Sequence, residues 1–130
     1  MYFNDVGILT NILYKHNIGA ILYTDKGLNI GSVYETVAAM ELIAHGHDLY
    51  YFDSKKVGEV DFFINDYDNL SILPIEIKSG KDGYEFRAIP KLVNKKGNYK
   101  LKKGYIFTNQ NICKKENDLY TFPIYMIMFV

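Results

Sequence analysis

Apolar residues recur with a helical period in the first third of the chain and alternate with polar residues, as in strands, through its middle. The segment Tyr2–Tyr14 predicts a short helix after an extended start. The clearest helix is predicted over Ser32–His45, with Ser32 as its N-cap and Gly46 as its stop signal. Two apolar stripes cover so much of this helix that we expect it to be well buried. They comprise Val33, Val37, Met40 and Ala44, and Ala38, Ala39 and Leu42.

Three strands are predicted in quick succession, and their short turn-like connections favour an antiparallel meander. They are Asp48–Phe52, Glu59–Ile64 and Ile72–Lys78. After Gly80 the chain becomes basic and irregular, with a weak helical signal over Pro90–Lys96. A fourth strand is predicted at Gly104–Thr108 and a fifth at Leu119–Phe122. The C-terminal segment FPIYMIMFV is too short to cross a bilayer, and we expect it to be buried.

These elements predict one α/β domain over residues 1–130, with a central mixed sheet of about four strands flanked by helices in the order α-β-β-β-α-β. A hydrophobic fraction of 48% is ample for a packed core. The N-terminus lacks the pattern of a secretory signal, and a single cysteine fits a reducing compartment. We therefore expect a cytoplasmic protein that does not associate with membranes.

The net charge of zero conceals an asymmetry between the two parts of the chain. Residues 1–75 carry ten acidic and four basic side chains, whereas residues 76–130 carry five acidic and eleven basic ones. Such a separation is typical of an acidic site beside a basic surface for a polyanion, and equally of two solvated faces that neutralise each other. The candidate contacts for nucleic acid are Lys81, Arg87, Lys91, Lys95, Lys96 and Lys100.

The candidate chemistry lies in Glu59-Val60-Asp61 on one predicted strand and Pro74-Ile75-Glu76-Ile77-Lys78 on the next. Alternate side chains of a strand share a face. Glu76 and Lys78 should therefore point one way while Ile75 and Ile77 point into the core, and Asp61 should project opposite to Val60 and Phe62. If the two strands pair, Asp61 lies beside Glu76.

Two adjacent carboxylates repel each other unless a cation lies between them, and Mg²⁺ or Mn²⁺ takes oxygen ligands. Asp61 and Glu76 are the candidate ligands, and Lys78 is a candidate to orient or deprotonate a water or to neutralise charge. The alternative is that Glu76 and Lys78 are simply the solvent-facing residues of a half-exposed strand. Glu35 also has two interpretations, which are compatible: a carboxylate directed at this site, or the partner of Ser32 in a capping box.

This pattern resembles the PD-(D/E)xK superfamily, which has the restriction-endonuclease-like fold. The resemblance maps Glu35 onto the helix glutamate, Asp61 onto the aspartate, and Glu76 and Lys78 onto the E-x-K motif. It implies a magnesium-dependent nuclease, with Asp61, Glu76, Lys78 and Glu35 as catalytic residues.

A closer likeness is to a C-terminal domain of unknown function found on bacterial and archaeal AAA-type ATPases. The matching segments are YFNDVGIL, VYETVAAMELIAHG, LYYF, GEVDFFI, LPIEIKSGK, KGYIFTN and FPIYMIMFV. No phosphate-binding G-x-x-x-x-G-K-[ST] motif occurs in the chain, so the ATPase part would be a separate, N-terminal region and this chain a fragment. The likeness also implies an alternative function, a catalytically silent module that docks nucleic acid or protein for the ATPase.

Overall fold

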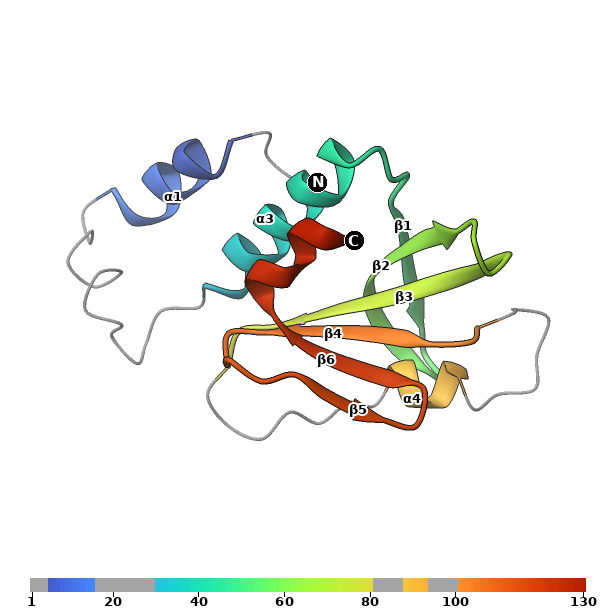
Figure 1. Ribbon diagram of the computed structural model, residues 1–130. Coiled ribbons are helices and arrows are strands. Elements are labelled where there is room, and N and C mark those ends of the chain that lie inside the picture. Colours follow the sequence, from blue (N-terminus) through green and yellow to red (C-terminus); the bar gives the residue numbers. More distant parts are fainter. Residues whose placement is uncertain (1–4, 16–29, 81–87, 94–100) are drawn as a thin grey trace.

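The computed structural model describes residues 5–15, 30–80, 88–93 and 101–130 (Figure 1). The chain is an α/β protein in which helices flank a mixed sheet, and the predicted α-β-β-β-α-β order is confirmed. In chain order the elements are α1 (Val6–Tyr14), α3 (Gly31–Ala44), β1 (Tyr50–Ser54), β2 (Gly58–Asp66), β3 (Ser71–Lys78), α4 (Ala88–Val93), β4 (Gly104–Thr108), β5 (Lys114–Glu116), β6 (Leu119–Pro123) and the 3₁₀ helix η1 (Ile124–Phe129).

The six strands formed by the described residues make one sheet in the order β1-β2-β3-β4-β6-β5. The antiparallel meander predicted for β1, β2 and β3 is confirmed. Strand β4 then pairs with β3 in parallel and β6 pairs with β4 in parallel, while the short strand β5, which the sequence did not predict, runs antiparallel to β6. The ends of β3 and β4 therefore lie side by side, as Figure 1 shows.

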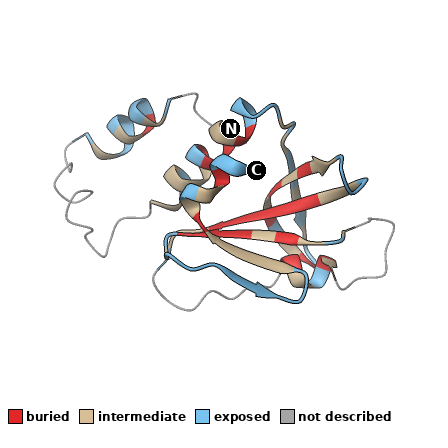
Figure 2. Ribbon diagram, in the orientation of Figure 1, coloured by how far each residue is buried: buried red, intermediate tan, exposed pale blue. Residues whose placement is uncertain are grey.

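Each face of the sheet has its own apolar core, and Figure 2 shows the buried positions along the central strands. On one face, α3 and η1 pack over Phe62, Ile75, Ile77 and Phe107. On the other face, α4 packs over residues of β2 and β4. Those residues and their α4 partners are Val60, Ile106, Ala88, Ile89 and Leu92. The inward direction predicted for Ile75 and Ile77 is confirmed.

Gly104 at the start of β4 shows how closely α4 approaches the sheet. A side chain at this position would collide with Ile89 of α4, with Leu119 and Pro74 also close by. Helix α4 was predicted at Pro90–Lys96 and begins earlier, at Ala88; residues 94–96 of that prediction lie outside the described residues.

The start of α3 differs from the prediction. Its N-cap is Ile30, without a side-chain capping bond, and Ser32 lies inside the first turn. The carbonyl oxygen of Ser32 accepts a bond from the hydroxyl of Thr36 (2.7 Å). The predicted N-cap at Ser32 is therefore wrong, and so is the capping box with Glu35, because a capping box requires the serine at the cap itself.

Helix α3 is also less buried than its two stripes predicted. Its stripe of Ala38, Ala39 and Leu42 is fully buried against the sheet. Val37 and Ile43 are exposed, because α3 contacts a sheet on one side only.

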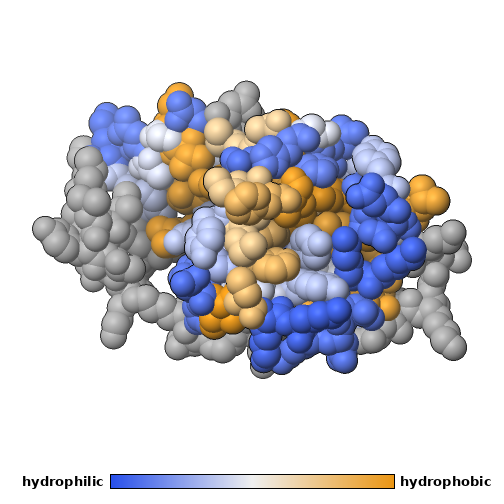
Figure 3. Space-filling model, in the orientation of Figure 1, coloured by the Kyte–Doolittle hydropathy of each residue, from blue (hydrophilic) through white to orange (hydrophobic). Residues whose placement is uncertain are grey.

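The C-terminal segment is likewise more exposed than predicted. In η1 only Ile127 is buried, whereas Tyr125, Met128 and Phe129 are exposed. Figure 3 shows apolar surface over this part of the molecule and hydrophilic surface along the β5 edge. Among the described residues, no helix has the length and apolar character needed to span a membrane.

Strict alternation breaks down in β2 next to Asp61. Tyr50 pairs with Phe63 and Phe52 pairs with Val60, so Tyr51 on β1 faces two residues of β2. This extra residue in β2 is a β-bulge, which changes the direction of the neighbouring side chains. Val60 consequently packs on the α4 side and Phe62 on the α3 side. The prediction that these two residues share a face is wrong.

Candidate functional site

The regular antiparallel pairing of β2 with β3 stops next to the bulge, one residue short of Asp61. The regular pairing ends at Phe62 and Ile75, so the next residues in register are Asp61 and Glu76. The Oδ2 atom of Asp61 accepts a hydrogen bond from the backbone N–H of Ile77 (2.6 Å). The carboxylate thus replaces the backbone acceptor that this N–H would have in a continuous ladder.

Glu76 and Lys78 form an ion pair on one face of β3. The Nζ of Lys78 lies 2.5 Å from Oε1 of Glu76, and the glutamate is only 5% exposed. The other carboxylate oxygen, Oε2, is buried without a hydrogen-bond partner among the described residues. An unsatisfied buried carboxylate oxygen is costly, and a water or an ion is one kind of partner that can satisfy it.

Glu35 approaches this group from α3, and its charge acts on Asp61 and Lys78. Burial raises the pKa of Asp61 to about 6; the bond from Ile77 and the charge of Lys78 oppose this rise, while Glu35 and Glu76 add to it. Burial likewise raises the pKa of Glu35. Although burial by itself lowers the pKa of Lys78, its bond to Glu76 and the charges of Glu76, Asp61 and Glu35 raise it overall. The structure therefore brings Glu35, Asp61, Glu76 and Lys78 together.

A fifth charged residue, Glu59, extends the site along β2 and had no assigned role in the sequence analysis. Its charge raises the pKa of Glu35, after burial the largest cause of that shift. The hydroxyl of Tyr51 on β1 donates to Oε1 of Glu59 (2.8 Å). The tripeptide Glu59-Val60-Asp61 was the sequence signal that could have indicated a role for Glu59. The alternation of side chains along a strand does not by itself predict that Glu59 lies near Glu35 of α3.

The raised pKa of Asp61 has a consequence for stability. Folding disfavours the ionised form of Asp61 and favours the protonated form. Protonated Asp61 therefore stabilises the folded protein below about pH 4, near the pKa of the unfolded chain, and this stabilisation is lost as the pH rises through about 6. Asp61→Asn, which keeps an acceptor for Ile77, should therefore be more stable than the wild type at pH 7. The gain should grow between pH 4 and pH 6 to at most about 3 kcal/mol.

Urea unfolding of both proteins at pH 4, 5, 6 and 7 measures this difference. Asp68→Asn, which removes a carboxylate from the exposed turn after β2, is the matched control. A difference between Asp61→Asn and the wild type that stays constant from pH 4 to pH 7 would contradict the expectation.

The donor set at this site suits a hard divalent cation that needs few protein ligands. No group of three or more His, Cys, Asp or Glu side chains within the described part of the chain is arranged to hold a metal ion. Mg²⁺, however, is commonly bound by one or two carboxylates together with waters and substrate phosphate. Asp61 and Glu76 supply two carboxylates, and a cation at Oε2 of Glu76 would displace no hydrogen bond from the described residues.

Of the six candidate contacts for nucleic acid, only Lys91 falls among the described residues, where it is exposed on α4. Lys81, Arg87, Lys95, Lys96 and Lys100 lie outside them. Two further lysines of the basic segment Arg87–Lys103 make contacts near the β2–β3 turn. Lys103 pairs with Asp66 (3.1 Å), and Lys102 donates to the carbonyl oxygen of Asn69 (3.1 Å).

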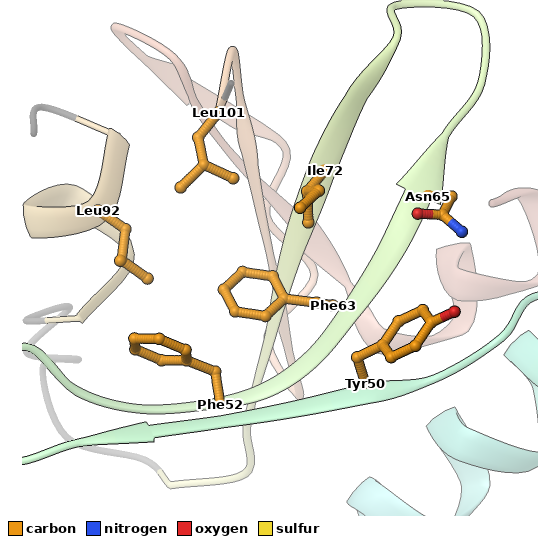
Figure 4. Close-up of a pocket in the computed structure, with 7 residues that line it drawn as sticks. All are labelled: Tyr50, Phe52, Phe63, Asn65, Ile72, Leu92 and Leu101. Atoms are coloured by element: carbon orange, nitrogen blue, oxygen red, sulfur yellow. The ribbon is translucent and has the colours of Figure 1, made fainter. Parts of the chain in front are cut away.

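A separate apolar pocket, with a volume of about 280 Å³, lies between the sheet and α4 (Figure 4). The rings of Phe52 and Phe63 meet edge to face in it, with centroids 5.5 Å apart. Asn65 and Tyr50 supply the polar groups of its lining, and none of its lining residues is charged. Apart from the phenol of Tyr50 its lining has no ionisable group, and it has no carboxylate, imidazole or thiol that could hold a metal. The charged cluster of Glu35, Asp61, Glu76 and Lys78 is therefore the candidate site.

Residues 30–127 match the sequence model of a family described as Domain of unknown function (DUF4143). The chain belongs to this family. The matched part of the DUF4143 domain includes α3, every strand of the described sheet and all four residues of the charged cluster, whereas α1 precedes it. No curated protein and no solved structure matches the chain.

Proposed function

We propose that this DUF4143 domain is a magnesium-dependent nuclease of the PD-(D/E)xK type, which hydrolyses phosphodiester bonds of nucleic acid. The observation that carries the proposal is the buried Glu76 carboxylate with one unsatisfied oxygen, near Asp61 and Lys78 where the pairing of β2 with β3 ends. Two carboxylates and a lysine in a partly buried site are the groups that metal-assisted hydrolysis uses.

Each residue has a distinct role in this proposal. Asp61 and Glu76 hold the cation, which when bound would polarise a phosphoryl oxygen and acidify a bound water. Lys78, whose raised pKa keeps it protonated at neutral pH, neutralises charge that develops on the phosphate. Glu35 adds a third negative charge from α3; without a cation this charge disfavours the ionised form of Asp61, and it would strengthen the attraction of the site for a cation.

Calorimetry with Mn²⁺ and a cleavage assay with labelled single- and double-stranded DNA and RNA test this function. We expect the purified protein to bind Mn²⁺ and to cleave at least one substrate slowly in Mg²⁺ or Mn²⁺, with chelation abolishing cleavage. A protein that binds no Mn²⁺ and cuts none of these substrates, alone or joined to an AAA-type ATPase region, would exclude the nuclease.

A second function is favoured by the contacts that the same residues already make. Lys78 neutralises Oε1 of Glu76, and Asp61 gives Oδ2 to the backbone of Ile77. Such contacts can stabilise the end of β3 without any catalysis. The domain would then be a silent module that docks nucleic acid or protein for an N-terminal AAA-type ATPase region.

Both functions permit nucleic-acid binding through the basic segment, and its salt dependence gives a further prediction. Phosphate contacts by lysines release counterions, so affinity should fall steeply with salt. Changing Lys95, Lys96 and Lys100 to Gln should reduce the slope of log K against log salt by about 2 to 3. Fluorescence anisotropy with labelled oligonucleotides measures this slope.

The matched control changes three exposed lysines outside the segment, Lys55, Lys56 and Lys114, to Gln. We expect this control to leave the slope nearly unchanged. Equal slopes for the wild type and both triple variants would mean that these lysines of the basic segment are exposed to solvent and do not contact phosphate.

A further inference from the structure

Asn109 directly follows β4 and lies beside the end of β3 that carries Lys78. Its backbone N–H donates to the carbonyl oxygen of Lys78 (3.3 Å), and its side-chain Nδ2 donates to the carbonyl oxygen of Ser79 (2.9 Å). The parallel pairing of β3 with β4 ends at Lys78 and Thr108. One residue therefore holds two consecutive carbonyl groups just where the ladder ends.

Asn109 is itself held in place by Thr108, which is only 1% exposed. The hydroxyl of Thr108 accepts a bond from the backbone N–H of Gln110 (3.2 Å) and lies 3.3 Å from the carbonyl oxygen of the same residue. Local bonds of this kind fix a bend in the backbone. The bend directly after β4 brings the Asn109 side chain to Ser79.

The end of β3 is thus secured from both neighbouring strands. On the β2 side, the carboxylate of Asp61 accepts from Ile77. On the β4 side, Asn109 binds the carbonyls of Lys78 and Ser79. The long lysine side chain loses considerable rotamer entropy when it is held in one geometry. Its ion pair with Glu76 therefore depends on a backbone that already points Lys78 at the glutamate.

We propose that Asn109 is a positioning residue that holds Lys78 against Glu76. The proposal concerns the geometry of the ion pair and needs no catalysis, whereas its kinetic consequence rests on the nuclease function proposed above. Without the Asn109 side chain, Ser79 loses one anchor, and Lys78 should sample directions away from Glu76.

A double-mutant cycle on the full chain measures the Glu76–Lys78 coupling in two backgrounds. The wild type, Glu76→Gln, Lys78→Met and the double variant give the coupling as a ratio of unfolding equilibrium constants. We expect about a tenfold coupling in the wild-type background and less than about twofold with Asn109→Ala. A role of Asn109 in stability alone would lower the unfolding free energy but leave the coupling unchanged.

Asn111→Ala is the matched control, because Asn111 lies in the same segment and bonds elsewhere, accepting from the Tyr125 hydroxyl (2.8 Å). It should retain the tenfold coupling, and Asn109→Gln, which keeps an amide donor, should restore at least part of it. A coupling that stays near tenfold in Asn109→Ala would overturn the proposal. So would a wild-type coupling near onefold, because Lys78 would then not be held against Glu76.

If the protein cleaves phosphodiesters, Asn109→Ala should lower kcat about tenfold with little change in KM or Mn²⁺ affinity. In a Lys78→Ala background the same change should have no further effect, because Asn109 acts through Lys78. A second tenfold loss in that background would contradict the proposal. Absence of cleavage in the wild type leaves the unfolding cycle unaffected, so failure of the function and failure of the positioning role are distinguishable.

Discussion

Replacing Asp61 or Glu76 by alanine is expected to abolish Mn²⁺ binding and phosphodiester cleavage together. Each substitution removes one of two carboxylates that would hold the cation, and the remaining carboxylate alone is a weak site. Calorimetry and cleavage assays on the same preparations measure both losses. Asp68→Ala, which removes an exposed carboxylate on the turn after β2, should change neither.

Lys78→Ala should separate binding from turnover. The variant removes the counter-ion of Glu76 but no oxygen ligand, so Mn²⁺ binding should persist. Turnover should fall about 10² to 10⁴-fold, the usual effect of losing a positioned acid–base or electrostatic group. Full activity in Lys78→Ala, or full Mn²⁺ affinity in Asp61→Ala and Glu76→Ala, would contradict the assigned roles.

The largest loss of stability is expected from Phe107→Ala. Phe107 is completely buried in β4, between the sheet and the α3–η1 layer, and its ring lies 5.9 Å from that of Phe122. Truncation removes the transfer free energy of the ring and leaves a cavity, at a cost of about 3 to 5 kcal/mol. Urea unfolding at pH 7 measures this change in the free energy of unfolding.

Phe129→Ala is the control for this substitution, because it removes the same type of side chain from a residue of η1 that is 76% exposed. It should change the free energy of unfolding by less than about 0.5 kcal/mol. Losses of similar size for the two variants would contradict the exposed position of Phe129 and favour the buried C-terminal segment that the sequence predicted.

Local periodicity determined much of the fold from the sequence alone. The alternation of Ile75 and Ile77 with Glu76 and Lys78 predicted the strand, its inward face and the two charged residues that share the other face. The glycine and polar turns between strands predicted the meander of β1, β2 and β3. These features depend on residues close together in the chain, so a single sequence was sufficient.

Other features depended on contacts between distant segments. The bulge in β2 places Val60 and Phe62 on opposite faces, because the excess residue appears only when β2 is paired with β1. The exposure of Val37 and Ile43 follows from the single sheet against which α3 packs. The helix begins at Gly31, although Ser32 has a stronger capping preference, because propensity at a cap is weak compared with packing.

For the charged cluster, too, some features could be predicted from the sequence and others depended on the tertiary structure. From the sequence, Asp61, Glu76, Lys78 and Glu35 were predicted as candidate site residues by residue type, spacing and resemblance. Only the tertiary structure decided that the carboxylate of Asp61 binds the Ile77 amide, that Lys78 pairs with Glu76, and that Asn109 binds the end of β3. Hydrogen bonds and ion pairs act over about 3 to 4 Å, so they form only after strands from distant parts of the chain have taken their register.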